Sequence, residues 1–100
     1  MGNSRLQTKK ITAFYGAECP YCMEIETVVE RLEQEDGVEM EVLEVWHNEE
    51  NKRVMNSLSR LYDKECNGNF VVPSFYDKET DRLICNPGTY ENLKTWIFED

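Results

Sequence analysis

Apolar and polar residues follow one another along this chain with two periods, one typical of strands and one typical of helices. Residues 10–15 are apolar on both faces, which predicts a central strand in a covered sheet. Pro20 suits the first turn of a helix that follows, and Gly37 suits its end. Between them, apolar residues recur at helical spacing and predict one buried helix face: Cys22, Ile25, Val29 and Leu32.

The middle of the chain predicts a second strand and a second helix. Residues 38–42 alternate between apolar and acidic side chains. Residues 43–46 lose this alternation, as a strand does when both of its faces become covered. Asn48 is suited to cap a helix that stops at Asn67-Gly68. The buried face of this helix would carry four apolar residues: Val54, Leu58, Leu61 and Tyr62.

The last third of the chain predicts a hairpin and a final helix. The apolar run 70–72 is interrupted by Pro73 and leads into residues 74–76, which predicts the first strand of the hairpin. A turn at 77–81 and a partner strand at 82–85 complete it. Thr89 is suited to cap a helix whose inner face carries four residues: Tyr90, Leu93, Trp96 and Ile97.

The element order βαβαββα indicates an α/β fold. A short βαβ crossover joins two parallel strands right-handedly, and the hairpin adds two antiparallel strands. We therefore expect a four-stranded mixed sheet with helices on both faces, in a single domain over 9–100 that follows a flexible tail at 1–8. Four aromatic residues have the spacing of core side chains, so no cofactor site is expected among them: Trp46, Tyr62, Trp96 and Phe98.

Composition limits the classes of function. The chain has 100 residues, with 20 acidic against 11 basic side chains and a formal net charge of −9. This charge gives a solvated surface that repels nucleic acid and anionic lipid and favours basic partners. No apolar run reaches the length of about 18 residues that a membrane span needs. The chain also starts without the apolar core of a secretory signal, so we expect a cytoplasmic monomer with no nucleic-acid or membrane partner.

The string Cys19-Pro20-Tyr21-Cys22 lies between the first strand and the first helix. Two cysteines separated by two residues can close a small disulfide and reopen it. At a helix N-terminus, free backbone N–H groups and the helix dipole stabilise the thiolate of the first cysteine. We expect Cys19 to be the more exposed of the two and to attack a substrate disulfide, after which Cys22 attacks Cys19 and releases the reduced substrate.

Four further residues bear on the chemistry of this string. Cys66 and Cys85 are expected to be buried free cysteines that act as small apolar side chains. An auxiliary disulfide is the alternative, because only geometry decides whether the two can pair. His47 is expected to be an ordinary loop histidine, and a general base near Cys19 is the alternative. Glu18 adjoins Cys19, and its charge opposes formation of the thiolate.

These motifs resemble the glutaredoxins of the thioredoxin superfamily over residues 9–98. The resemblance rests on the Cys-Pro-Tyr-Cys string, on Val72-Pro73 before the hairpin and on Gly88 before the last helix. It implies the thioredoxin fold, with a cis Pro73 against the CxxC turn and a Val72 backbone that pairs with an extended substrate. The substrate-binding surface would then include these residues: Pro20, Tyr21, Val72, Pro73 and Glu91.

The same resemblance implies a thiol–disulfide oxidoreductase, with no bound cofactor or metal. Its partners would be disulfide-containing proteins or glutathione mixed disulfides, and its electron donor would be glutathione or a thioredoxin reductase-type enzyme. The chain departs from the family pattern at Gly16, where glutaredoxins usually have a lysine that binds glutathione, and at Thr89, where a second glycine is usual. Thioredoxins have a buried aspartate where this chain has Ala13. These departures leave the donor open.

Two other classes of function remain as alternatives. Cys19 and Cys22 supply half of a zinc site that Cys66, Cys85 or His47 could complete. An iron–sulfur cluster shared between subunits is less favoured, because the resemblance implies that Pro20 disfavours it. A non-catalytic adaptor with this fold would keep its function after the substitution Cys19→Ser.

Overall fold

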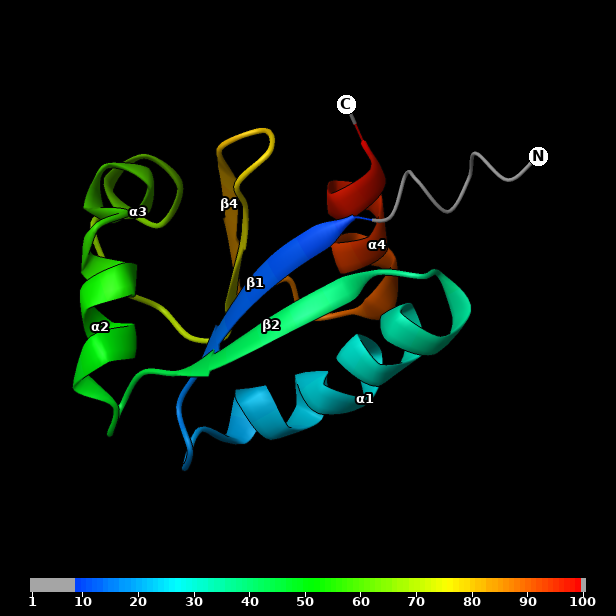
Figure 1. Ribbon diagram of the computed structural model, residues 1–100, viewed down its shortest axis with the longest axis horizontal. Helices are drawn as coiled ribbons and strands as arrows, with labels where there is room; N and C mark the ends of the chain where they lie inside the picture. Colours follow the sequence, from blue (N-terminus) through cyan, green and yellow to red (C-terminus); the bar gives the residue numbers. More distant parts are fainter. Residues whose placement is uncertain (1–8, 100) are drawn as a thin grey trace.

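The computed structural model describes residues 9–99 and shows a four-stranded sheet with the order β2-β1-β3-β4 (Figure 1). The strands are β1 (Lys10–Tyr15), β2 (Glu39–Glu44), β3 (Ser74–Asp77) and β4 (Arg82–Cys85). The helices are α1 (Pro20–Glu35), α2 (Glu49–Asn56), α3 (Ser59–Glu65) and α4 (Tyr90–Phe98). Within the described residues, no helix is long and apolar enough to cross a membrane. The expected tail at 1–8 lies outside the described residues.

The central place of β1, predicted from its apolar faces, is confirmed. β1 pairs with β2 in parallel and with β3 in antiparallel orientation. Because of the antiparallel pairing, Ser74 at the start of β3 lies opposite Phe14 near the end of β1. The CxxC turn that follows β1 and the Val72-Pro73 step that precedes β3 therefore lie at the same end of the sheet.

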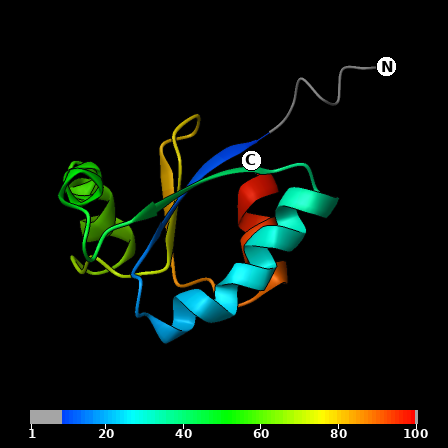
Figure 2. The same cartoon turned by 60° about the horizontal axis from the view of Figure 1, so that its bottom comes forward.

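Helices cover both faces of the sheet, as predicted (Figure 2). Ala13 of β1 packs in the core cluster beneath α1 and α4, whereas its neighbour Phe14 packs in the cluster beneath α2 and α3. Successive strand residues point to opposite faces, so one central strand supplies both clusters. Each fully buried large apolar side chain contributes about 1.5–3 kcal/mol to stability. These contacts fix the end of β1 from which the CxxC turn extends.

The single helix predicted after Asn48 is instead two helices. α2 ends at Asn56 and α3 begins at Ser59, although the Asn48 cap is confirmed because its side chain accepts the Asn51 amide. Ser57 donates a hydrogen bond from its hydroxyl to the Val54 carbonyl, an interaction that often bends or ends helices. The break leaves Val54 45% exposed, contrary to prediction.

Two of the four aromatic residues assigned to the core are largely exposed. Tyr62 and Trp96 are buried, as expected. Trp46 and Phe98 are 43% and 46% exposed, so their assignment to the core was wrong. Phe98 is the last residue of α4, and Trp46 lies over a loop glycine described below.

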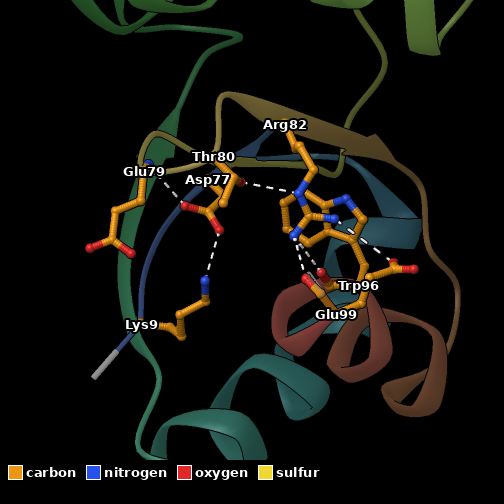
Figure 3. Close-up of polar contacts among 7 residues, drawn as sticks. All are labelled: Lys9, Asp77, Glu79, Thr80, Arg82, Trp96 and Glu99. Carbon is orange, nitrogen blue, oxygen red and sulfur yellow. Dashed lines mark hydrogen bonds and ion pairs between the residues drawn. The ribbon is translucent and has the colours of Figure 1, made fainter. Parts of the chain in front are cut away.

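Ionic contacts fasten the sheet at the end opposite to the CxxC turn (Figure 3). Asp77 at the end of β3 is almost fully buried, and its carboxylate is 3.2 Å from the Lys9 ammonium. Arg82 on β4 lies over the Trp96 ring and donates to the Trp96 carbonyl at 2.9 Å. The same guanidinium is 3.8 Å from the Glu99 carboxylate. The β3–β4 hairpin thus holds both the start of β1 and the end of α4.

Candidate active site

Cys19 is the N-cap residue of α1, as predicted from the position of the CxxC string. Its backbone is extended (φ −80°, ψ 117°), and its Sγ accepts a hydrogen bond from the Cys22 amide at 3.2 Å. The Cys19 amide in turn donates to the Gly16 carbonyl at 3.1 Å. The sulfur therefore takes the place of the oxygen that usually caps a helix, at the positive end of the helix dipole.

Cys19 is not the more exposed cysteine, which corrects the sequence-based expectation. Cys19 is 3% exposed and Cys22 is 6% exposed. The Cys19 thiol is turned toward the Val72 carbonyl, 3.9 Å away, and so lies against the segment that precedes β3. The exposed residues of the turn are Pro20 and Tyr21, the latter 60% exposed.

The Val72-Pro73 peptide bond is cis and lies beside Cys19, as the resemblance implied. Pro73 is buried, and its carbonyl accepts the Asn86 amide at 2.7 Å, which fixes the segment to the residue after β4. Val72 itself is half-buried. Among residues 9–99, no backbone hydrogen bond engages the Val72 amide or carbonyl. The Val72 amide therefore has no backbone partner among these residues, and the Val72 carbonyl faces the Cys19 thiol.

The environment of Cys22 keeps its thiol protonated. Burial raises the pKa of Cys22 to about 12, with a further contribution from its hydrogen bond with the Cys19 side chain. At neutral pH, Cys22 is therefore a proton carrier rather than a thiolate. The two cysteines are chemically unequal, which dithiol exchange requires of a first and a second nucleophile.

Glu44 at the end of β2 ties the loop before Cys19 to the loop after β2. Its carboxylate accepts backbone N–H groups from Ala17 (2.9 Å), Trp46 (3.0 Å) and His47 (2.9 Å). Desolvation alone would raise the pKa of Glu44, but these N–H donors outweigh it and the pKa is lowered. Glu44 therefore remains charged and holds both loops at one edge of the site.

Trp46 is a residue of the site that sequence reasoning missed. Its indole ring lies on Gly16, so closely that a Cβ on Gly16 would be 2.2 Å from the ring. Gly16 is the position where glutaredoxins usually have a lysine, and here the ring fills that space. A signal was present, because a glycine and a tryptophan follow two adjacent parallel strands and so had to meet at one edge of the sheet.

The substitution Gly16→Ala is expected to lower the free energy of unfolding by about 1–3 kcal/mol, the usual cost of overpacking. The new methyl group must displace the Trp46 ring. Chemical denaturation of a double-mutant cycle with Trp46→Ala measures this contact. If Gly16→Ala costs as much in the Trp46→Ala protein as in the parent, the ring does not lie on Gly16.

His47 is an exposed loop histidine, as expected, and its ring contacts Glu18 rather than a cysteine. The His47 Nε2 lies 2.8 Å from the Glu18 carboxylate. This hydrogen bond, together with the charge of Glu18, raises the pKa of His47 above 6.5. When the ring is protonated, its charge neutralises the carboxylate next to Cys19. Because the ring contacts Glu18, the general-base alternative for His47 finds no support in this geometry.

The pairing of His47 with Glu18 predicts a pH dependence. We expect the His47 ring to titrate above pH 6.5 in an NMR titration, because the folded protein raises its pKa. Any stability that the pair adds is complete below pH 6.5 and is lost as the pH rises through the folded pKa. Glu18→Gln should lower the midpoint toward 6.5, with the charge of Glu44 still raising it, and an unchanged midpoint would contradict the pairing.

The comparisons with known proteins bear on this arrangement. No protein-family model and no curated protein sequence matches the chain. The structure is similar to the crystal structure of a glutaredoxin from Archaeoglobus fulgidus, with a TM-score of 0.60 and 18% sequence identity. The similarity covers 100% of this chain and 97% of that one. The chain has the glutaredoxin form of the thioredoxin fold. At this identity, the similarity establishes the fold alone.

Glu91 makes no direct contact with the cysteines by hydrogen bond or ion pair within the described residues. It lies exposed in the first turn of α4, behind the Thr89 cap, whose side chain accepts the Asn92 amide as predicted. Among the described residues, Glu91 makes no hydrogen bond or ion pair with the CxxC turn or with Val72. Its assignment to the substrate surface remains a prediction.

The cysteines outside the CxxC turn form a disulfide, so the expectation of two free thiols was wrong. Cys66 at the end of α3 is bonded to Cys85 at the end of β4, with their Cα atoms 6.2 Å apart. Antiparallel pairing of β4 with β3 brings Cys85 beneath α3. The distance between the two Cα atoms lies within the ordinary range for a disulfide. Because these two sulfurs are bonded to each other, they cannot join Cys19 and Cys22 as the thiolate ligands of a zinc ion. Nor do any three His, Cys, Asp or Glu side chains within residues 9–99 form a metal site.

Proposed function

We propose that the chain is a thiol–disulfide oxidoreductase that reduces protein disulfides through Cys19 and Cys22. The observation that carries this proposal is the position of Cys19, which caps α1 with its sulfur facing both the Cys22 amide and the Val72 carbonyl. The glutaredoxin fold and the unequal environments of the two cysteines support it.

The proposed reaction transfers two electrons from the two thiols to the substrate disulfide. The Cys19 thiolate attacks one substrate sulfur, so that a mixed disulfide forms and the first substrate thiolate leaves. Cys22 then attacks the Cys19 sulfur, which closes the Cys19–Cys22 disulfide and expels the second substrate thiolate. The proton of Cys22 passes to this leaving group. Because its pKa is raised to about 12, Cys22 holds that proton until the mixed disulfide forms.

The substrate is proposed to add to the backbone at Val72. Within residues 9–99, the Val72 amide and carbonyl have no backbone partner, and the carbonyl lies 3.9 Å from the Cys19 sulfur. An extended segment paired there would bring its disulfide to Cys19, as in other peptide complexes formed by strand addition. The exposed ring of Tyr21 would form the opposite wall.

The electron donor is proposed to be a reductase of the thioredoxin reductase type rather than glutathione. Glutathione carries two carboxylates, and the groups beside Cys19 are the carboxylates of Glu18 and Glu44. The Trp46 ring fills the position where a family lysine would bind glutathione. These features disfavour a small anionic donor.

The test is to oxidise the protein and follow its reduction by each donor. Oxidised protein is mixed with glutathione and glutathione reductase, or with thioredoxin reductase, and consumption of NADPH is measured with a protein disulfide present. We expect turnover with the reductase and little turnover with glutathione. Fast turnover with glutathione would overturn the proposed donor. If neither donor supports turnover, the oxidoreductase function is overturned.

A further inference from the structure

An open groove runs along α1 beside the sheet and ends at the CxxC turn. Its cavity volume is about 360 Å³. Its floor is mainly apolar and includes side chains of α1 and of three strands: Ala13, Val29, Val42 and Phe75. Its end is formed by residues of the turn and of the segment before β3: Gly16, Ala17, Cys22, Met23 and Pro73. The groove therefore leads directly to the redox pair.

One rim of the groove carries a row of three glutamates of α1: Glu26, Glu30 and Glu33. All three are exposed, and among the described residues no lysine, arginine or histidine forms an ion pair with them. Glu35, in the last turn of the same helix, is by contrast paired with Arg31 at 3.3 Å. Like charges three or four residues apart on a helix repel one another. The helix thus keeps uncompensated charge along this rim.

The apolar part of the groove is also open to solvent. Val42 is 51% exposed on β2, which is an edge strand, and Met23 is 67% exposed beside the CxxC turn. A lysine or arginine side chain fits such a surface, because its alkyl stem packs on apolar atoms while its charged end reaches a carboxylate. Charge complementarity therefore selects a basic occupant over an anionic one.

We propose that this groove is the docking surface for an extended polypeptide segment that bears lysine or arginine. A second part rests on the proposed function: the docked segment is the one that carries the substrate disulfide, so that the protein prefers disulfides in basic sequences. The groove ends at Cys22 and Pro73, and a segment seated in it continues toward Val72 and Cys19.

The dimensions of the groove fit such a segment. From Cys22 to Glu33, α1 rises by about 16 Å. An extended chain of about five residues covers the same length. Glu26 and Glu30 are separated by about 6 Å along the helix axis, close to the spacing of alternate side chains in a strand. Basic residues at alternate positions would therefore meet successive glutamates, and the residues between them would face away from this rim.

The experiment compares two peptides that differ only in charge. Each carries one cysteine in a mixed disulfide with thionitrobenzoate, and one has lysine at alternate positions where the other has serine. Release of thionitrobenzoate by the reduced protein is followed by absorbance at low and high salt. We expect the lysine peptide to react on the order of tenfold faster at low salt, with the advantage shrinking as salt screens the rim. The variant Glu26→Gln/Glu30→Gln/Glu33→Gln should bring the ratio of the two rates close to one.

A matched variant separates the groove from overall charge. Glu50→Gln/Glu65→Gln/Glu79→Gln removes the same amount of charge from exposed residues of α2, α3 and the β3–β4 turn. It should keep the preference for the lysine peptide. If both peptides react with the parent protein at equal rates, the groove proposal is overturned. Loss of the preference in this matched variant would also overturn it.

Binding is measured separately from reaction, so that the two proposals fail in different ways. Fluorescence anisotropy reports binding of a labelled lysine peptide in which alanine replaces cysteine. If this peptide binds and the groove variant weakens its binding, the docking surface stands even when neither disulfide peptide reacts, and the proposed function alone fails. If both disulfide peptides react through Cys19 but the labelled peptide does not bind, the proposed function stands and the docking surface is overturned.

Discussion

The variant Cys19→Ser is expected to reduce protein disulfides no faster than the uncatalysed exchange. In the proposed reaction, Cys19 provides the sulfur at the cap of α1 that meets the substrate, and Cys22 cannot replace it, because burial raises the pKa of Cys22 to about 12. A serine hydroxyl still accepts the Cys22 amide, so the helix keeps its cap. The loss should therefore appear in turnover of a protein disulfide and not in the thermal stability of the fold.

The variant Cys22→Ser should behave differently from Cys19→Ser. It retains the first nucleophile and loses the second, so the reaction should stop at a mixed disulfide between Cys19 and the substrate. Non-reducing gel electrophoresis and mass spectrometry detect this adduct. Equal activity of Cys19→Ser and the parent would reject the oxidoreductase function and favour an adaptor.

Removing the Cys66–Cys85 bond is expected to lower the free energy of unfolding by about 3 kcal/mol. The bond closes a loop between residues separated by 19 positions, and so it restricts the unfolded chain. For a domain of this size, such a loss lowers the melting temperature by roughly 10–20 °C. The double variant Cys66→Ala/Cys85→Ala and calorimetry measure it. Alanine avoids placing a hydroxyl at Cys66, which is 7% exposed.

The control for this measurement uses the reductant itself. In a background with Cys19→Ser and Cys22→Ser, dithiothreitol can act only on Cys66–Cys85, so it should lower the melting temperature to that of the alanine variant. The alanine variant should not respond to reductant. Free thiols at Cys66 and Cys85 in untreated protein, detected by alkylation, would contradict the disulfide.

Most of the fold could be predicted from the sequence because its signals are local. The apolar run of β1, the spacing along α1 and the caps at Asn48 and Thr89 each act within a few residues, and the structure confirms them. The position of Cys19 at the helix cap follows from the same local pattern. The break between α2 and α3 coincides with the hydrogen bond from the Ser57 hydroxyl to the Val54 carbonyl, and the apolar spacing alone did not show it.

The features that sequence reasoning missed depend on contacts between distant segments. The pairing of Cys66 with Cys85 depends on the register of β4 and on where α3 ends. The Cys19 thiol faces the distant segment at Val72. The contact of Trp46 with Gly16 joins two loops that only the parallel pairing of their strands brings together. For Cys19, Cys66 and Cys85 the chemistry of the residue was visible in the sequence, and its neighbour was not.

The ionic contacts of the β3–β4 hairpin determine where the molecule can be attached. Lys9 contacts Asp77 and Glu99 contacts Arg82, so both ends of the described chain are held at the hairpin (Figure 3). Cys19 follows the opposite end of β1. A resin, an electrode or a fused reporter joined at either end of the described chain would lie at the end of the sheet opposite to Cys19 and Cys22. The two ends of the described chain are therefore suitable attachment points for studying the proposed disulfide exchange on a surface.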